Sequence, residues 1–320
     1  MIRFLASRAL GAFVVLVAKS FVIFALIGLM PGDPIDLLMT ANPEATPEDI
    51  AHLRKLYGVD TPIPVRYWHW LVGAVQGDFG YSRMQHRPVL EIVIPALGNT
   101  IILTLTAFTI ATAIAITLGT IAALKRGTWI ERAIGLLAYT GISVPTFWLG
   151  LVLIYLFAVT LGWLPAGGMP KPEDGWTGLF RHLALPVLTL VIVEIGAPTR
   201  YARAAMIEVL NQDYIRTARA KGITNTRMII RHALRNAMIP VVTIIALGMG
   251  NLFSGALLTE TIFAWRGMGR LILEAIMGND YNLALVCLLF TTATILAANI
   301  LADVAYTKLD PRIALGGRRK

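Results

Sequence analysis

The chain has 320 residues, of which 56% are hydrophobic and only 15% are charged, and its formal net charge is +9. This share of apolar side chains is too large for a water-soluble domain of this length, so the composition predicts an integral membrane protein in contact with lipid. A nucleic-acid-binding protein would gather its basic residues on one soluble face and carry a recognition motif. No such motif is present, so a nucleic-acid partner is excluded.

Six apolar runs are long enough to cross a bilayer, which takes roughly 17–25 helical residues each. They cover residues 9–30, 99–124, 133–161, 183–199, 238–263 and 283–307. The fourth run is short and contains Pro186, Glu194 and Pro198. If it were re-entrant, the long basic loop that follows would change sides. The pattern predicts an all-α protein with six transmembrane helices.

The charges divide between the two sides of this topology. With the N-terminus inside the cell, 18 of the 28 Lys and Arg residues lie in segments predicted to be cytoplasmic, and nine lie in outer segments. Of the 19 acidic residues, 13 lie in outer segments and four in cytoplasmic ones. Basic loop residues resist translocation, so both termini are expected in the cytoplasm. The expected location is the bacterial inner (plasma) membrane.

This topology divides the chain into four parts. Residues 1–30 form the N-terminal cytoplasmic end and the first transmembrane helix, and residues 31–98 form an extracytoplasmic segment with amphipathic helices. Residues 99–307 form a five-helix core that includes the cytoplasmic loop 200–237. Residues 308–320 form a basic cytoplasmic tail.

The outer segment is predicted to contain two helices, at residues 46–58 and 65–76. The second helix is flanked by Tyr67 and Trp70, and its apolar stripe consists of Val65, Trp68, Val72 and Val75. Aromatic-rich amphipathic helices beside a span tend to lie in the membrane interface. We interpret the segment as a lid over the bundle, with a docking place for an external partner at its edge.

Patterns that would indicate chemistry are missing. There is no G-x-x-x-x-G-K-[ST] loop to hold a nucleotide, no clustered His or Cys ligands for a metal, and no G-x-S-x-G nucleophile elbow. We therefore expect no catalytic, cofactor-binding or metal-binding residues.

Several polar residues lie within the predicted spans. Ionisable groups are costly there, so Lys19, Glu194 and Asp303 are either pathway groups or structural ones. In the structural interpretation Asp303 lies near the headgroups and Lys19 pairs with Glu194. Candidates for the translocation pathway are Glu194, Asn251 and Ser254. The threonines of the second span are expected to bond within their own helix, namely Thr100, Thr104, Thr106, Thr109, Thr112 and Thr117.

The most informative segment is the basic loop. Its two helix-patterned runs are separated by Gly222, as a protruding helix–turn–helix requires. A long, ordered loop usually binds something, and the charge places this loop on the cytoplasmic side. The loop therefore predicts a cytoplasmic partner.

Residues 213–243 resemble the cytoplasmic EAA loop of ABC importer permeases, whose generic pattern is E-A-A-x3-G-x9-I-x-L-P. The corresponding places hold Arg216, Thr217, Ala218, Gly222, His232, Ala233, Leu234 and Arg235. Only an alanine, the glycine and a leucine match the generic form, and the proline comes later, at Pro240. The segments ARAKG and HALRN are the departures typical of the dipeptide, oligopeptide and nickel branch.

The resemblance covers nearly the whole chain. Further motifs of that branch are PGDP at 31–34, YGVD at 57–60, GDFG at 77–80, the glutamate and glycines at 260, 267 and 269, and LDPR at 309–312. Two departures lie outside the membrane, because Arg266 and Asn282 stand where the branch usually has proline. The large first outer segment resembles the "B" member of the permease pair.

The resemblance implies a type I ABC importer permease fold and a transport subunit without enzymatic activity of its own. The implied partners are a second homologous permease, two cytoplasmic ATPases that bind the ATP, and an extracytoplasmic substrate-binding protein. The implied solutes are peptides or peptide-like molecules. The implied ATPase-coupling residues are Arg216, Thr217, Ala218, Arg219, Ala220, Lys221, Gly222, His232 and Arg235.

Two other classes stay open at this point. A self-sufficient secondary carrier would need ligands for a coupling ion, for which Glu194 is the only obvious candidate, and would give the basic loop no purpose. A membrane-anchored scaffold would not need polar residues at mid-depth in its spans.

Overall fold

The computed structural model describes residues 2–29 and 61–309, with side chains left out at 2–5, 243, 246–255 and 305–309. The predicted helix at 46–58, the PGDP and YGVD motifs and the end of the basic tail lie outside these residues. Within them the regular elements are helical, and the one β-bridge joins Tyr81 to Pro88. The predicted all-α class is confirmed for the described part of the chain.

The elements follow one another in a simple order. The first half contains α1 (Ile2–Gly28), α4 (Ile63–Val75), α5 (Val89–Leu124), α6 (Trp129–Ser143), α7 (Thr146–Leu153) and the π-helical turn η1 (Ile154–Thr160). The second half contains η2 (Pro172–Asp174), α8 (Gly175–Glu194), α9 (Gly196–Leu210), α10 (Asp213–Ala220), α11 (Asn225–Met228), η3 (Ile229–Leu234), α12 (Arg235–Ile262), α13 (Met268–Met277) and α14 (Tyr281–Leu309).

Among the described residues, four helices are long and apolar enough to cross a membrane. They lie at Ala6–Gly28, Val89–Leu124, Pro172–Glu194 and Tyr281–Val304, and the pair α6 and α7 with η1 counts as a fifth if it is one bent span. That pair bends by 106°, so the run predicted to span at 133–161 is not one straight helix. The break falls at Val144, because a residue before proline avoids the helical region and Pro145 follows.

Two helices begin earlier than the sequence predicts. α5 starts at Val89 instead of 99 and contains Pro95, and α8 starts at Gly175 instead of 183 and contains Pro186. A helix within a bundle tolerates proline when neighbouring groups satisfy the freed backbone. Pro95 and Pro186 therefore lie inside helices.

α5 is the central helix of the bundle. Along one stripe of this helix, every fourth residue is buried. All but the first residue of the stripe are small: Leu103, Ala107, Ala111, Ala115 and Gly119. Small side chains let helices approach closely in a membrane bundle. α8 and α9 pack along this face.

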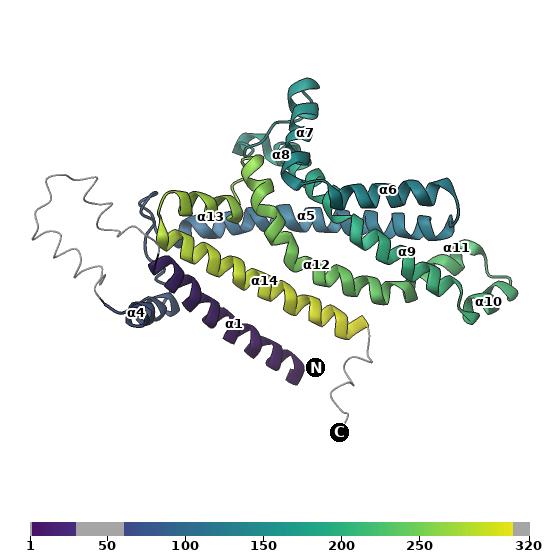
Figure 1. Cartoon of the computed structure of the whole chain (residues 1–320), viewed down its shortest axis with the longest axis horizontal. Coiled ribbons are helices and arrows are strands. Elements are labelled where there is room, and N and C mark those ends of the chain that lie inside the picture. The colour runs from purple at the N-terminus through teal and green to yellow at the C-terminus, as the bar shows by residue number, and fades with distance from the viewer. Residues whose placement is uncertain (1, 30–60, 310–320) are drawn as a thin grey trace, which may run out of the picture.

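The short helices between the long ones lie at the two ends of the bundle (Figure 1). α4 and α13 lie at one end, and α10 and α11 lie at the other. α1 and α14 lie side by side between them, joined by an ion pair of 3.2 Å between Arg8 Nε and Asp303 Oδ2. Asp303 is therefore a structural group in this fold.

α4 packs on α1 through its aromatic flank. Tyr67 is buried, its hydroxyl lies 2.7 Å from Ser20 Oγ, and its ring meets the edges of Phe21 and Phe24. The four residues of the predicted apolar stripe are exposed instead, with Trp68 at 63%. The stripe thus faces away from the bundle, as a helix in the membrane interface would require.

Candidate functional site

The basic loop is a compact helical unit. Its buried apolar residues share one core with α9 and the first turns of α12, and the members from the loop are Ile215, Ala218, Met228 and Ala233. Asn236 Nδ2 on α12 donates to the hydroxyl of Tyr214 on α10 at 3.1 Å. The loop is therefore held against the helices that enter and leave it.

Gly222 ends α10 in a Schellman motif. Its φ is +73°, a left-handed conformation that favours glycine. The Gly222 N–H donates to Arg219 O at 3.0 Å, and the Ile223 N–H donates to Ala218 O at 3.2 Å. These are the two hydrogen bonds of that cap. The turn expected at Gly222 is present.

The predicted coupling residues divide into two groups by position. Exposed residues of α10 and its cap are Arg216, Thr217, Arg219, Ala220, Lys221 and Gly222. Ala218 is buried, so its small size serves the packing of α10 on this chain. His232 is half-buried in η3, and Arg235 is exposed at the start of α12. The structure brings the first group together and leaves the last two on separate turns.

Two other basic residues near the loop have partners inside the chain. Arg203 on α9 forms an ion pair with Glu131 on α6, with 2.8 Å between Nε and Oε1. The guanidinium of Arg200 lies 5.1 Å from the ring centre of Tyr139. These contacts join α9 to α6, so Arg200 and Arg203 hold the helix that leads into the basic loop.

At the opposite end, Glu260 of α12 caps the start of α13. Its Oε2 accepts the backbone N–H groups of Gly269 and Arg270 at 2.7 and 3.3 Å, and its Oε1 accepts the hydroxyl of Thr100 at 2.6 Å. Thr100 in turn accepts the Met268 N–H at 2.7 Å. The expectation that Thr100 bonds within its own helix is wrong, because its hydroxyl joins α5 to α12 and α13.

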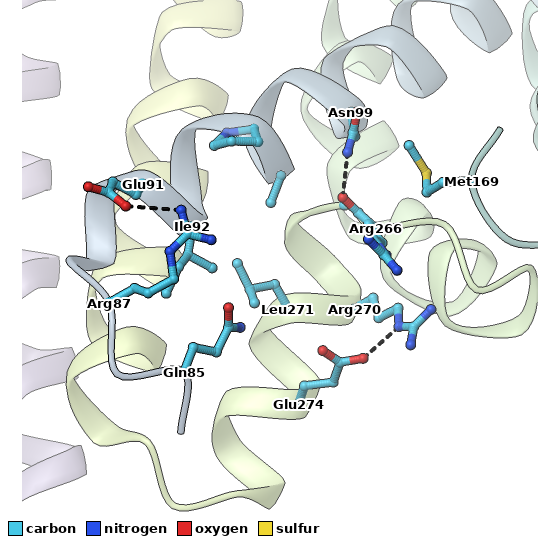
Figure 2. A pocket seen from close by; sticks show the side chains of 13 residues that line it. Gln85, Arg87, Glu91, Ile92, Asn99, Met169, Arg266, Arg270, Leu271 and Glu274 are labelled. Atoms are coloured by element: carbon cyan, nitrogen blue, oxygen red, sulfur yellow. Dashed lines mark hydrogen bonds and ion pairs between the residues drawn. The ribbon is translucent and has the colours of Figure 1, made fainter. Parts of the chain in front are cut away.

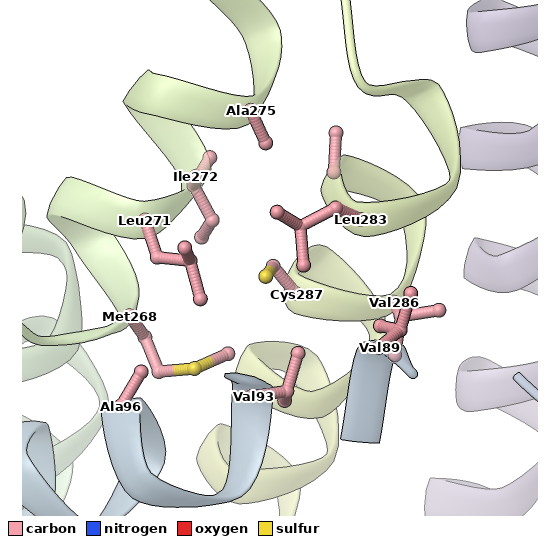
Figure 3. Packing of buried hydrophobic residues seen from close by; sticks show 11 residues of the cluster. Val89, Val93, Ala96, Met268, Leu271, Ile272, Ala275, Leu283, Val286 and Cys287 are labelled. Carbon is pink, nitrogen blue, oxygen red and sulfur yellow. The ribbon is translucent and has the colours of Figure 1, made fainter. Parts of the chain in front are cut away.

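Gly267 is required by this cap. A β-carbon at Gly267 would lie 2.1 Å from Glu260 Oε1, so only glycine leaves room for the carboxylate. An apolar cluster beneath the cap holds α13 against α5 and α14, through Met268, Val93, Leu283 and their neighbours (Figure 3). Reasoning from the sequence named Glu260 only as part of a family motif. The usable signal was an acid at the end of an apolar run, seven residues before G-x-G.

The predicted pathway residues are only partly described. Glu194 is half-buried at the end of α8, whereas the side chains of Asn251 and Ser254 lie outside the described ones. Lys19 is exposed on α1, and among the described residues no ion pair joins it to Glu194. In residues 2–29 and 61–309, no three His, Cys, Asp or Glu side chains gather as a metal site would need.

Comparison with protein families decides the class of the chain. Residues 115–315 match the model of the binding-protein-dependent transport system inner membrane component, and residues 1–104 match the N-terminal model of such membrane components. The chain belongs to this family of ABC importer permeases. This permease is a transport subunit, and nothing in the comparisons favours a secondary carrier.

Individual relatives agree with the family. The permease is 40% identical over 316 residues to a protein of Brucella suis biovar 1 named a peptide permease, with 98% of this chain and 99% of the relative covered. It is 38% identical over 313 residues to the glutathione transport system permease protein of Escherichia coli K12, with the same coverage of both chains. Its fold resembles that of the MetNI methionine ABC transporter in an inward-facing conformation, with a TM-score of 0.56, 15% identity and coverage of 68% of this chain and 95% of that one.

Proposed function

We propose that this permease is the "B"-type membrane subunit of an importer that carries peptides or peptide-like solutes across a bacterial inner membrane. It would cross the membrane six times with both termini in the cytoplasm. α12 would provide a span in addition to the four described ones and the bent pair. The two relatives named for peptide and glutathione transport support the solute class.

The exposed basic surface of α10 carries the proposal. Arg216, Arg219 and Lys221 project from a helix whose buried face packs on α9 and α12, so a push on α10 passes directly into the bundle. The one described ion pair among them, Arg216 with Asp213 at 3.5 Å, is exposed and therefore weak. These cations are available to carboxylates of another protein.

The partner at this surface would be one of two cytoplasmic ATPases. α10 would lie in a groove of the ATPase as a short helix, which is a common mode of recognition. Closure of the ATPases on ATP would rock this permease against a second, homologous permease and switch a central cavity between the two sides. An extracytoplasmic binding protein would deliver the solute at the end of α4 and α13.

Replacement of Gly222 tests the coupling role of the loop. Gly222→Leu places a branched side chain at φ +73° and should break the cap of α10. We expect uptake of a labelled dipeptide to fall by about tenfold or more, since left-handed strain of about 1–2 kcal/mol would displace α10 from the ATPase groove. Membrane insertion should stay normal, as immunoblots of membrane fractions would report.

Two further variants control for bulk alone. Thr224→Leu adds the same side chain two residues away, where φ is −58°, and should leave uptake near wild type. Gly222→Asn should keep most uptake, because asparagine tolerates the left-handed region. Normal uptake by Gly222→Leu would refute the coupling role.

A further inference from the structure

A cavity of about 490 Å³, with charged and apolar side chains in its walls, lies beside the cap of α13, at the end of the bundle opposite to α10. Its walls come from the turn before α5, the first three turns of α5, Met169, and the start of α13 (Figure 2). Cavities of roughly 300–1,000 Å³ hold small-molecule ligands. In the topology proposed above, this cavity opens on the extracytoplasmic side.

The cavity carries an excess of one positive charge. Three arginines and two glutamates line it. Arg87 pairs with Glu91 at 2.9 Å and Arg270 pairs with Glu274 at 2.6 Å, each within one helical turn. Among the described residues, the guanidinium of Arg266 has no carboxylate partner.

Arg266 is held by its backbone and not by its side chain. Asn99 Nδ2 on α5 donates to the carbonyl of Arg266 at 2.8 Å (Figure 2). The backbone is fixed further because Trp265 donates its indole N–H to Asn99 O at 3.0 Å and Gly267 is packed on Glu260. The fixed backbone sets where the Arg266 side chain starts, and its exposed guanidinium is open to an incoming anion, although ordering this side chain on binding costs about 0.5–1.5 kcal/mol.

We propose that this cavity is a site for the free carboxylate of the transported solute, with Arg266 as the residue that binds it. The inference rests on the proposed function. A planar guanidinium binds a carboxylate through two parallel hydrogen bonds. The described ion pairs use Oε2 of Glu91 and Oε1 of Glu274, which leaves the second oxygen of each for the ammonium of a zwitterionic peptide. A single acidic side chain of a docked protein would leave most of this volume empty, so the size favours a small solute.

The test measures binding without the binding protein. The full permease, purified in lipid nanodiscs with whatever subunits accompany it, is titrated with trialanine and with trialanine amide by saturation-transfer NMR. We expect Arg266→Gln to weaken binding of trialanine by about tenfold, the loss typical of one charge-assisted contact, and Arg266→Lys to restore part of it. Binding of the amide should be weak and equal in all three proteins.

Arg181→Gln is the control, because Arg181 is another exposed arginine, in the second turn of α8, and lines a different cavity. It should bind trialanine like the wild type. Equal affinity of Arg266→Gln and the wild type for trialanine would overturn the proposal. If no ATPases accompany the purified permease, the proposed function is contradicted. The titration still tests the role of Arg266, because it measures binding of trialanine to the permease alone.

Discussion

Ala264 has a backbone conformation that alanine adopts at a cost. Its φ is +50°, and it ends α12 in the same kind of cap that Gly222 provides for α10. The Ala264 N–H donates to Thr261 O at 3.2 Å, and the Trp265 N–H donates to Glu260 O at 2.9 Å. The chain turns back at Ala264, which brings the start of α13 to the side chain of Glu260. This cap therefore positions the contact between the end of α12 and the start of α13, called the outer junction below.

We expect Ala264→Gly to stabilise the permease. The substitution removes left-handed strain of about 1–2 kcal/mol. Glycine also stabilises the unfolded state by about 0.5–1 kcal/mol through its greater chain entropy, so the net gain lies between about 0 and 1.5 kcal/mol. The measurement is the thermal unfolding midpoint of the purified protein by tryptophan fluorescence, which should rise.

Ala256→Gly is the control, because Ala256 is buried inside the same helix, where an alanine is not strained. There glycine loosens the helix and also removes a buried methyl group, so it should lower the midpoint by the equivalent of about 1 kcal/mol or more. A drop in the midpoint for both variants would show that the turn at Ala264 carries no strain.

At the scale of elements, α13 depends on two other helices for its N-terminus. The backbone donors of Met268, Gly269 and Arg270 are all satisfied by side chains from α5 and α12. A helix leaves its first N–H groups unpaired unless a cap supplies acceptors, and an anion at that end also favours the helix dipole. Glu260 therefore orders a surface that contains Arg266 and Arg270.

Glu260→Gln should destabilise this junction. The amide can keep its oxygen toward the backbone donors, but it then places an NH2 donor against the Thr100 hydroxyl, which donates to Oε1 of the glutamate, so the free energy of unfolding should fall by about 2 kcal/mol. Buried Trp265 lies within the junction and is one of the seven tryptophans whose fluorescence reports thermal unfolding. Glu173→Gln is the control, since Glu173 is exposed and its ion pair with Lys171 at 3.6 Å is worth little. An unchanged unfolding midpoint for Glu260→Gln would contradict the capping role.

The sequence predicted the apolar helices well and their ends poorly. Hydrophobic runs fix where a helix must lie, whereas Pro95 and Pro186 sit inside helices and Pro145 breaks one. Each is a proline in an apolar context. What distinguishes them is whether neighbouring helices satisfy the freed backbone, and that information is tertiary.

The candidate site was predictable where local rules decide it. The turn at Gly222 follows from the preference of glycine for positive φ, and the family pattern identified the residues around it. The cap at Glu260 joins residues 100, 260 and 267–270, and the cavity around Arg266 draws on residues from 85 to 274. Such contacts depend on how helices distant in sequence pack, so the sequence could at most mark Glu260 and the following G-x-G, and not their partner Thr100 or the cavity.

For the whole molecule, the proposed topology makes a prediction about accessibility. The one cysteine, Cys287, is buried, so Cys287→Ala should give a folded background without thiols. In that background Gln76→Cys, at an exposed position directly after α4, should react with a membrane-impermeant maleimide in intact spheroplasts. Lys221→Cys, next to the tip of the basic loop, should react only after lysis, because basic loops stay in the cytoplasm.

The control for this labelling is denatured membrane, where both cysteines must react fully. Labelling of Lys221→Cys in intact spheroplasts would show that the basic loop lies outside the cell, opposite to the proposed topology. It would also remove the ATPases as partners of α10, since these act in the cytoplasm.

The shared cap of α13 also constrains the order in which the protein can be made. A ribosome delivers Thr100 with α5 first, Glu260 with α12 much later, and the three donors of α13 directly afterwards. The acceptors are thus both in place before the donors emerge, and α13 has no cap until α5 and α12 have met. Assembly of the outer junction is therefore a late event in biosynthesis. It is completed when α14, which follows α13 in the chain, packs against α13.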